Sequence, residues 1–173
     1  MLSKRKRDKS IKTPSFKGLK SASAASSYAK KKNKRRNTQH EILLQHELRQ
    51  MRFRFHKNVE SLPGKPDIVF PHAKLAVFCD GDFWHGRNWR SLQKKLKKGA
   101  NAAYWLAKIA ANIKRDKRNT ALLTKNGWRV IRVWETEIKR DSLTIAKLIK
   151  KTLHMRQRQF RQKTDRQRGD NRK

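Results

Sequence analysis

The stretch PGKPDIVFPHAKLAVFCDGDFWHG, residues 63–86, contains the two segments that decide the fold class. PDIVF and KLAVFCD are short, are rich in β-branched and aromatic residues, and are bounded by proline and glycine, so each predicts a β-strand. The step from Pro71 to Lys74 between them predicts a hairpin turn. Working outward from this hairpin, we expect the other elements to cover a small sheet.

Helices and one further strand are expected on both sides of the hairpin. TQHEILLQHELRQM places its leucines and isoleucine on one helical stripe, with Thr38 as the N-cap and Glu41 as its partner in a capping box. Residues 101–125 have helical spacing and end at Asn126-Gly127, WRVIRVW alternates with period two, and EIKRDSLTIAKLIKKTL predicts a closing amphipathic helix. This order predicts an α/β three-layer sandwich in which helices flank a small central mixed β-sheet.

The charge balance indicates a polyanionic partner. The 173 residues include 47 Lys and Arg but only 13 Asp and Glu, and nucleic acid is the first candidate partner for such a chain. A ribosomal or packaging protein that coats phosphates is the alternative. A membrane-surface protein is disfavoured because the basic segments lack an apolar face, and no apolar run reaches the roughly 20 residues that span a bilayer.

Composition divides the chain into one domain, residues 37–153, and two basic arms. Residues 1–36 carry fourteen basic residues and one acid, and residues 154–173 carry eight and two, so both arms are expected to be disordered. A phosphate-binding role for the first arm competes with an organelle transit peptide or a nuclear signal. The single cysteine, Cys79, excludes an intramolecular disulfide and suits a reducing compartment. We expect a cytoplasmic, nucleoid-associated protein, or a nuclear or organellar one in a eukaryotic host.

Three aspartates gather in the opening stretch although acids are scarce elsewhere. Asp67 heads the first strand, and Asp80 and Asp82 follow on the second. Mg²⁺ prefers one or two carboxylates with backbone carbonyls and waters, so this pattern can hold a divalent cation among phosphate-binding side chains. Histidine titrates near neutrality, which makes His85 a candidate general base or acid. The alternative is that the aspartates sit in turns, as an Asp80-Gly81 dipeptide often does.

The long helix predicted over residues 101–125 adds further polar residues. At about 100° per residue, Trp105, Asn112 and Asp116 fall within about 20° of one line along the helix. Asp116 can point at the same metal or its waters. Its basic neighbours in the sequence equally allow a local ion pair, which contributes little when exposed.

LPGKPDIVFPHAKLAVFCDGDFWHG and, further on, YWLAKIAANIKRDKRNTALLTKNGWRVIRVWE closely resemble the very-short-patch-repair endonucleases, the Vsr family. The resemblance covers roughly residues 37–141, and its separate motifs occur in the family's order. It implies a restriction-endonuclease-like fold and an enzyme that nicks DNA beside a T:G mismatch.

For the metal, the resemblance implies Mg²⁺ held by the carboxylate of Asp67 and the backbone carbonyl of Cys79. The family's other active-site histidine is replaced here by Asp80, which is an additional candidate ligand. The cysteines that hold a structural zinc in the mismatch-repair members are replaced by Asp82 and Thr136, so no zinc is expected.

The catalytic set implied by the resemblance is Asp67, His85, Glu41 and Asp116. His85 corresponds to the histidine that activates the attacking water, and Glu41 to a helix glutamate near the metal-bound waters. Asn112 and Asp116 correspond to helix residues that orient those waters.

The DNA-binding residues implied by the resemblance begin with three aromatics. Phe83, Trp84 and Trp105 correspond to side chains that family members wedge into the base stack, which costs a few kcal/mol of unstacking and favours already weakened pairs. Plain core packing is the alternative for these rings. Three basic residues near the site in sequence are also expected to contact DNA: Lys65, Lys114 and Arg115.

These observations predict a Mg²⁺-dependent endonuclease that nicks double-stranded DNA in T:G-initiated very short patch repair. A phage, homing or defence-type endonuclease without mismatch specificity is one alternative, and a non-catalytic DNA-binding protein is another. No membrane partner is expected, and the oligomeric state is left open with a monomer favoured.

Overall fold

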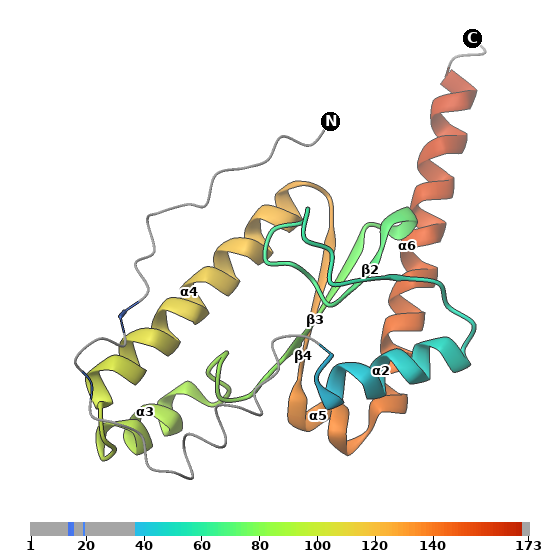
Figure 1. Cartoon of the computed structure of the whole chain (residues 1–173). Helices are drawn as coiled ribbons and strands as arrows, with labels where there is room; N and C mark the ends of the chain where they lie inside the picture. The colour runs from blue at the N-terminus through green and yellow to red at the C-terminus, as the bar shows by residue number, and fades with distance from the viewer. Residues whose placement is uncertain (1–13, 16–18, 20–36, 171–173) are drawn as a thin grey trace.

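The computed structural model describes residues 14–15, 19 and 37–170, and a four-stranded mixed sheet lies at its centre (Figure 1). The strands, in spatial order, are β1 (His56–Lys57), β2 (Ile68–Phe70), β3 (Leu75–Asp80) and β4 (Arg129–Trp134). β2 pairs antiparallel with both β1 and β3, whereas β3 and β4 run parallel. The predicted hairpin is confirmed, with the 3₁₀ turn η1 (Pro71–Ala73) joining β2 to β3.

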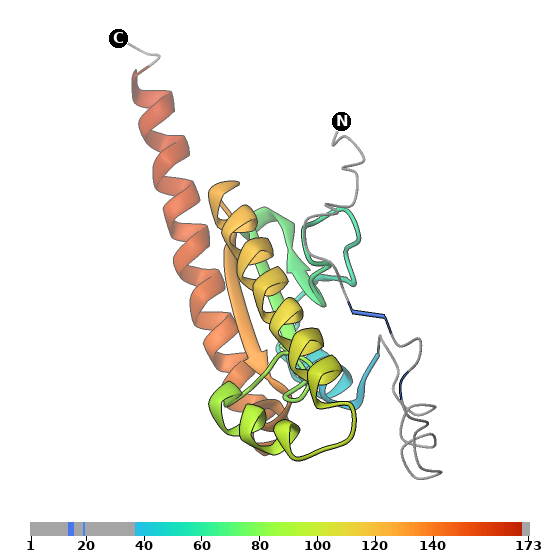
Figure 2. The same cartoon turned by 90° about the vertical axis from the view of Figure 1, so that its left-hand side faces the viewer.

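Helices cover both faces of this sheet and give the expected three layers (Figures 1 and 2). On one face lies α4 (Ala102–Lys125), and on the other lie α2 (Gln39–Gln50) and α6 (Ser142–Asp170). The short helices are α3 (Trp89–Lys97), which precedes α4, and α5 (Glu135–Arg140), which links β4 to α6. Two parallel strands need a long crossover, so the chain leaves the sheet after β3 and returns as β4 through α3 and α4.

The central strand β3 is buried along its whole length and supplies both cores. Leu75, Val77 and Cys79 belong to the core beneath α2 and α6, whereas Ala76 and Phe78 belong to the core beneath α4. A strand covered on both faces needs apolar residues at consecutive positions, which explains the unbroken apolar run LAVFC, residues 75–79.

The C-terminal part of the chain departs from the expected organisation. The expectation of a disordered arm from residue 154 is corrected, because α6 continues from Ser142 to Asp170. Ala146, Ile149 and Leu153 are buried against the body and stabilise the first half of the helix. Arg, Gln and Lys then propagate a helix well once it has formed.

Three further features were not expected from the sequence. β1 has only two residues, and α3 was missed although Trp89, Leu92 and Leu96 recur at helical spacing. The predicted closing helix is divided into α5 and α6 at Asp141, whose backbone is not helical (φ −158°, ψ 81°). Apart from residues 14–15 and 19, the arm 1–36 lies outside the described residues.

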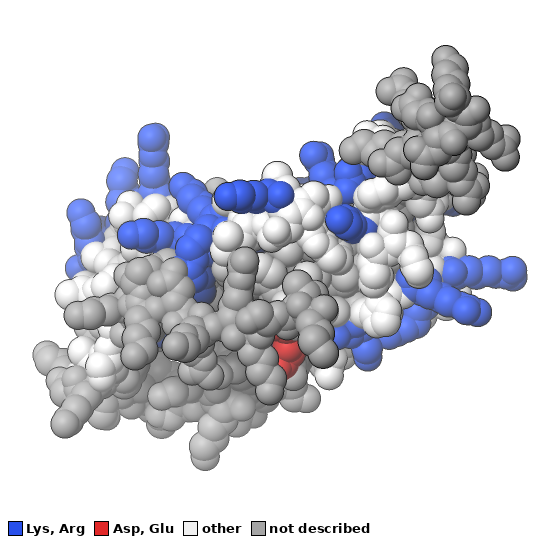
Figure 3. All heavy atoms as spheres, turned by 90° about the horizontal axis from the view of Figure 1, so that it is seen from above, with Lys and Arg blue, Asp and Glu red and all other residues white. Residues whose placement is uncertain are grey.

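The surface is strongly basic, as the composition requires. Seen from above, Lys and Arg side chains stand out over much of the described part of that face, and Asp or Glu atoms show at one point (Figure 3). No helix within the described residues is long and apolar enough to cross a membrane.

Candidate active site

The predicted catalytic residues meet at the end of the sheet where β3 and β4 finish. β2 runs antiparallel to β3, so Asp67, directly before β2, lies beside Cys79 near the end of β3. Glu41 comes from α2, His85 from the loop after β3, and Asp116 from α4. Three layers of the fold thus contribute side chains to one place.

Asp67 is an acid whose ionisation is opposed by its surroundings. Its Oδ2 accepts a hydrogen bond from the Cys79 N–H at 2.7 Å. Burial raises the pKa of Asp67 from 3.8 to about 7; the bond from Cys79 opposes this rise, and the charges of Glu41 and Asp80 add to it. Such an environment favours a bound cation, which would keep the carboxylate ionised.

Glu41 is buried and held from the residues that precede its helix. Its Oε2 accepts the Asn37 N–H at 2.9 Å, and its Oε1 accepts the Thr38 hydroxyl at 2.7 Å. The N-cap position of Thr38 is confirmed, but the capping box is wrong in detail, because the Thr38 hydroxyl donates to Glu41 and makes no side-chain cap bond. The neighbouring His40, which the sequence did not single out, places Nε2 3.3 Å from the Cys79 carbonyl oxygen.

Asp80 forms a bidentate ion pair with Arg132 of β4. The Nε and Nη2 atoms of Arg132 each lie 2.6 Å from one oxygen of Asp80. The Asp80 side chain is 5% exposed, so this pair is largely withdrawn from water. Arg132 also lies over the ring of Phe78 at 4.5 Å. It was not selected from the sequence, because a charged residue in WRVIRVW is expected to face solvent.

His85 and Asp116 form the second close pair of the site. Nδ1 of His85 lies 2.6 Å from Oδ2 of Asp116 and 3.5 Å from Oδ1 of Asp80. Burial by itself lowers the pKa of His85, but the hydrogen bond to Asp116 and the nearby charges outweigh it and the net shift is upward. With Nδ1–H donated to Asp116, Nε2 is the ring nitrogen left to exchange a proton.

The shared helix face predicted for α4 is confirmed by its contacts with the loop after β3. Trp105 packs on the rings of Phe83 and Trp84 at centroid distances of 5.6 and 5.9 Å. Asn112 donates from Nδ2 to the Trp84 carbonyl at 2.9 Å, so its amide holds the loop. Gly86 has φ +71°, and a Cβ there would lie 2.6 Å from Ile113, so only glycine lets the loop approach α4 this closely.

The aromatic residues form a cluster that is only partly buried. Phe83 and Trp84 are 37% and 36% exposed and meet edge to face at 5.1 Å. Tyr104, which was not selected from the sequence, extends the cluster with a centroid 5.0 Å from Trp105. A closed core would bury these rings, whereas this aromatic cluster is partly exposed and lies beside the acidic side chains of the site.

The three basic residues expected to contact DNA differ in their surroundings. Lys65 pairs with Glu60 at 3.4 Å on the surface, and Lys114 is exposed. Arg115 donates from Nη1 to the Asn112 amide oxygen at 2.9 Å, so it lies beside the loop-holding amide.

Asp82 and Thr136, the two positions where the resemblance implies zinc cysteines in other members, are joined by polar contacts. The Thr136 hydroxyl donates to Asp82 at 3.2 Å, and Arg87 lies 3.7 Å from Asp82 and 3.4 Å from Glu137. Within residues 37–170 and the few described before them, no group of three or more His, Cys, Asp or Glu side chains is arranged to hold a metal ion.

Comparisons with known proteins identify relatives of this chain. Residues 21–91 match the family model described as "DNA mismatch endonuclease Vsr". The chain is 35% identical over 125 residues to the type II nicking enzyme V.NmeDIP of Neisseria meningitidis serogroup C, covering 72% of this chain and 83% of that one. It is 34% identical over 127 residues to the type II nicking enzyme V.HpaIIP of Haemophilus parainfluenzae, covering 73% and 89%.

A more distant match carries the name of the family itself. The DNA mismatch endonuclease Vsr of Escherichia coli (strain K12) is 36% identical over 85 residues, covering 49% of this chain and 53% of that one. The extent of the two nicking-enzyme matches and the agreement of the family model leave one assignment. The chain belongs to the Vsr family of DNA endonucleases.

Proposed function

We propose that this enzyme hydrolyses a phosphodiester bond in duplex DNA beside a T:G mismatch, in a Mg²⁺-dependent nicking reaction. The observation that carries the proposal is the partly buried Asp67 carboxylate next to Cys79, across from the His85–Asp116 pair. The relatives named as nicking enzymes and as a mismatch endonuclease support the same reaction class.

The donor set fits Mg²⁺. Asp67 offers a carboxylate whose pKa of about 7 reflects burial and neighbouring acids, and the Cys79 carbonyl lies on the adjacent strand. Few protein donors with remaining sites for water and phosphate are typical of Mg²⁺. When bound there, the cation would supply Lewis-acid stabilisation of phosphate charge. Asp80 is left out of the ligand set, because Arg132 occupies both of its oxygens.

The protein's own residues supply proton transfer and orientation. Asp116 accepts the His85 Nδ1–H and fixes the ring, so that Nε2 accepts the proton of the attacking water. Glu41, held by Asn37 and Thr38, orients water at the same end of the sheet. Lys65, Lys114 and Arg115 would neutralise phosphates.

The exposed aromatic cluster accounts for mismatch preference. Phe83, Trp84 and Trp105 brace one another, so a ring can enter the base stack without further ordering. Unstacking is cheapest at a weak pair, which favours T:G over T:A.

A nicking assay tests the proposal directly. Duplexes with one T:G or one T:A pair, and supercoiled plasmid, are incubated with the wild-type protein in Mg²⁺ or EDTA. We expect Mg²⁺-dependent nicking of the T:G duplex that is lost in Asp67→Asn and kept in Glu47→Gln, a matched acid-to-amide change outside the site. Equal activity of Asp67→Asn would overturn the site, and equal nicking of T:A would overturn the mismatch preference.

A further inference from the structure

Arg132 lies between the two acids that surround His85. On β4 it is paired with Phe78 of β3, so its guanidinium projects on the α4 side of the sheet above the Phe78 ring. Nε and Nη2 contact the two oxygens of Asp80 at 2.6 Å each, and Nη2 also lies 3.2 Å from Oδ1 of Asp116. One planar group therefore joins β3, β4 and α4.

The geometry gives His85 two competing acceptors. Its Nδ1 lies 2.6 Å from Asp116 and 3.5 Å from Asp80. Arg132 engages both oxygens of Asp80, which weakens Asp80 as an acceptor for the imidazole. The same guanidinium holds Oδ1 of Asp116, which leaves Oδ2 aimed at Nδ1.

We infer that Arg132, acting with Asp80, is a positioning residue. It keeps the His85 ring hydrogen-bonded to Asp116 and so fixes the direction in which Nε2 points. The inference rests on the proposed role of His85 as the base. Asp80 stands where the resemblance implies a histidine in other family members. In this chain, Asp80 contributes to the positioning of His85 only when it is paired with Arg132 on the adjacent strand.

A buried ion pair that only stabilises the fold is the competing explanation. A lysine at position 132 separates the two, because it keeps the charge but lacks the planar fork that can bind both Asp80 oxygens and still reach Asp116. Asp80→Asn combined with Arg132→Leu removes the pair as a unit, which buried pairs often tolerate without loss of stability. Arg129→Lys is the matched control, on the same strand and exposed.

The experiment measures kcat and KM on the T:G duplex at saturating Mg²⁺, together with thermal unfolding. We expect Arg132→Lys and the double variant to lower kcat on the order of 100-fold, as misplacement of a reacting group does, with KM within about twofold and Arg129→Lys unchanged. Long-range ¹⁵N NMR of DNA-free protein, recorded at a pH high enough to deprotonate the imidazolium, should show a single His85 tautomer with Nδ1 protonated in wild type and a mixture in the variants.

The possible results distinguish a failure of this inference from a failure of the proposed function. Wild-type kcat in folded Arg132→Lys, or an equal loss in Arg129→Lys, overturns the inference while Asp67→Asn still reports on the proposed function. If Arg132→Lys does not fold, the double variant decides, and wild-type kcat there overturns the inference. A wild-type protein that fails to nick either duplex removes the proposed function, and the NMR result then decides the positioning of His85 alone.

Discussion

The end of the sheet that holds the proposed catalytic residues differs from the outer face of α6 in how its charged side chains are paired. Around the site, seven of the 13 acids in the chain lie close to basic partners or to one another: Glu41, Asp67, Asp80, Asp82, Asp116, Glu135 and Glu137. On α6, between Ser142 and Phe160, there are five Lys and Arg and no acid.

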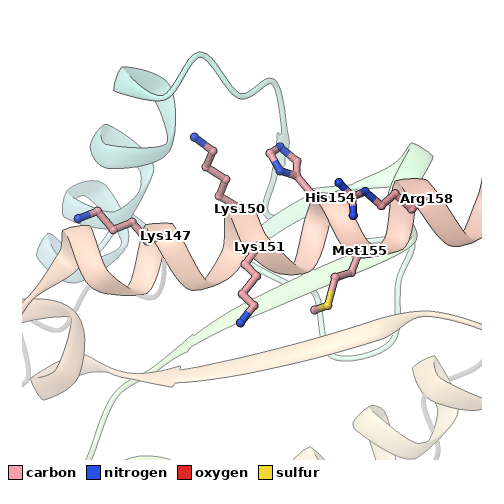
Figure 4. Close-up of a pocket in the computed structure, with 6 residues that line it drawn as sticks. All are labelled: Lys147, Lys150, Lys151, His154, Met155 and Arg158. Carbon is pink, nitrogen blue, oxygen red and sulfur yellow. The ribbon is translucent and has the colours of Figure 1, made fainter.

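The α6 face is open and cationic. Its exposed side chains line a shallow hollow of about 390 Å³ (Figure 4): Lys147, Lys150, Lys151, His154, Met155 and Arg158. Among the described residues, none of these four Lys and Arg forms an ion pair with an acid. Paired charge fixes geometry, whereas unpaired charge on a surface attracts a polyanion and is screened by salt. The paired charges of the site therefore hold side chains in fixed orientations, whereas the unpaired charges of the α6 face attract a polyanion.

The largest expected effect is at His85, the proposed general base. His85→Ala should lower kcat on the T:G duplex by about 10³-fold, the range of a lost general base, without changing duplex affinity measured by fluorescence anisotropy. His46→Ala, an exposed histidine on α2, is the control. A kcat within tenfold of wild type would contradict the role of the pair.

Asp67→Asn should stabilise the metal-free protein. Because the pKa of Asp67 is raised from 3.8 to about 7 in the folded state, its ionisation opposes folding; the cost is absent below about pH 3.8 and complete above about pH 7. The amide removes the cost, so urea unfolding should show a gain of about 1–3 kcal/mol at pH 8 and under about 0.5 kcal/mol at pH 4. A lower free energy of unfolding for Asp67→Asn at pH 8 would contradict the expectation that burial and the neighbouring acids destabilise the ionised Asp67.

Neutralising the basic side chains of the α6 face should weaken DNA binding and leave the rate of the chemical step unchanged. Changing Lys147, Lys150, Lys151 and Arg158 together to Gln should raise the dissociation constant for duplex DNA roughly tenfold at about 0.15 M salt, and should flatten the log–log salt dependence by at least about 1. The kcat at saturating DNA should stay at the wild-type value. An unchanged salt slope would remove this face from DNA binding, and the difference should shrink at high salt.

The smallest expected effect concerns the polar contacts of Arg87 with Asp82 and Glu137. Arg87 contacts Asp82 and Glu137 through side chains that are 27–31% exposed. Removing both members in Arg87→Ala/Glu137→Gln, in a double-mutant cycle, should give a coupling of about 1 kcal/mol or less in urea unfolding, typical of a partly exposed pair. A coupling above about 3 kcal/mol would make this bridge comparable to a structural metal.

Part of the site could be predicted from the sequence, because a hairpin between neighbouring strands and the spacing along one helix bring its residues together. Asp67 and Cys79 are brought together by a hairpin whose strands and turn are legible in the sequence. Trp105, Asn112 and Asp116 share a helix face by spacing, and all three contact the 81–86 loop. The match between these expectations and the structure is therefore a consequence of short-range geometry.

The remainder depends on pairing between distant segments. Arg132 reaches Asp80 only because β4 adds to β3 in parallel after a long crossover, a register that alternation in WRVIRVW does not specify. The extent of α6 was missed for a different reason. A polar basic sequence reads as disordered by composition, and packing of its first half is what allows the helix to continue.

Cys79 gives this enzyme a built-in chemical reporter. It is the only thiol in the chain, it is 7% exposed, and burial followed by the charges of Asp67 and Glu41 raises its pKa well above the usual range. Because the thiolate is the reactive form and the thiol is buried in the core, a maleimide or disulfide reagent can modify it only when the core around Cys79 opens. The rate of that modification thus measures how often the catalytic end opens, in unlabelled wild-type protein, and slower labelling on adding Mg²⁺ or a duplex would report closure without any turnover.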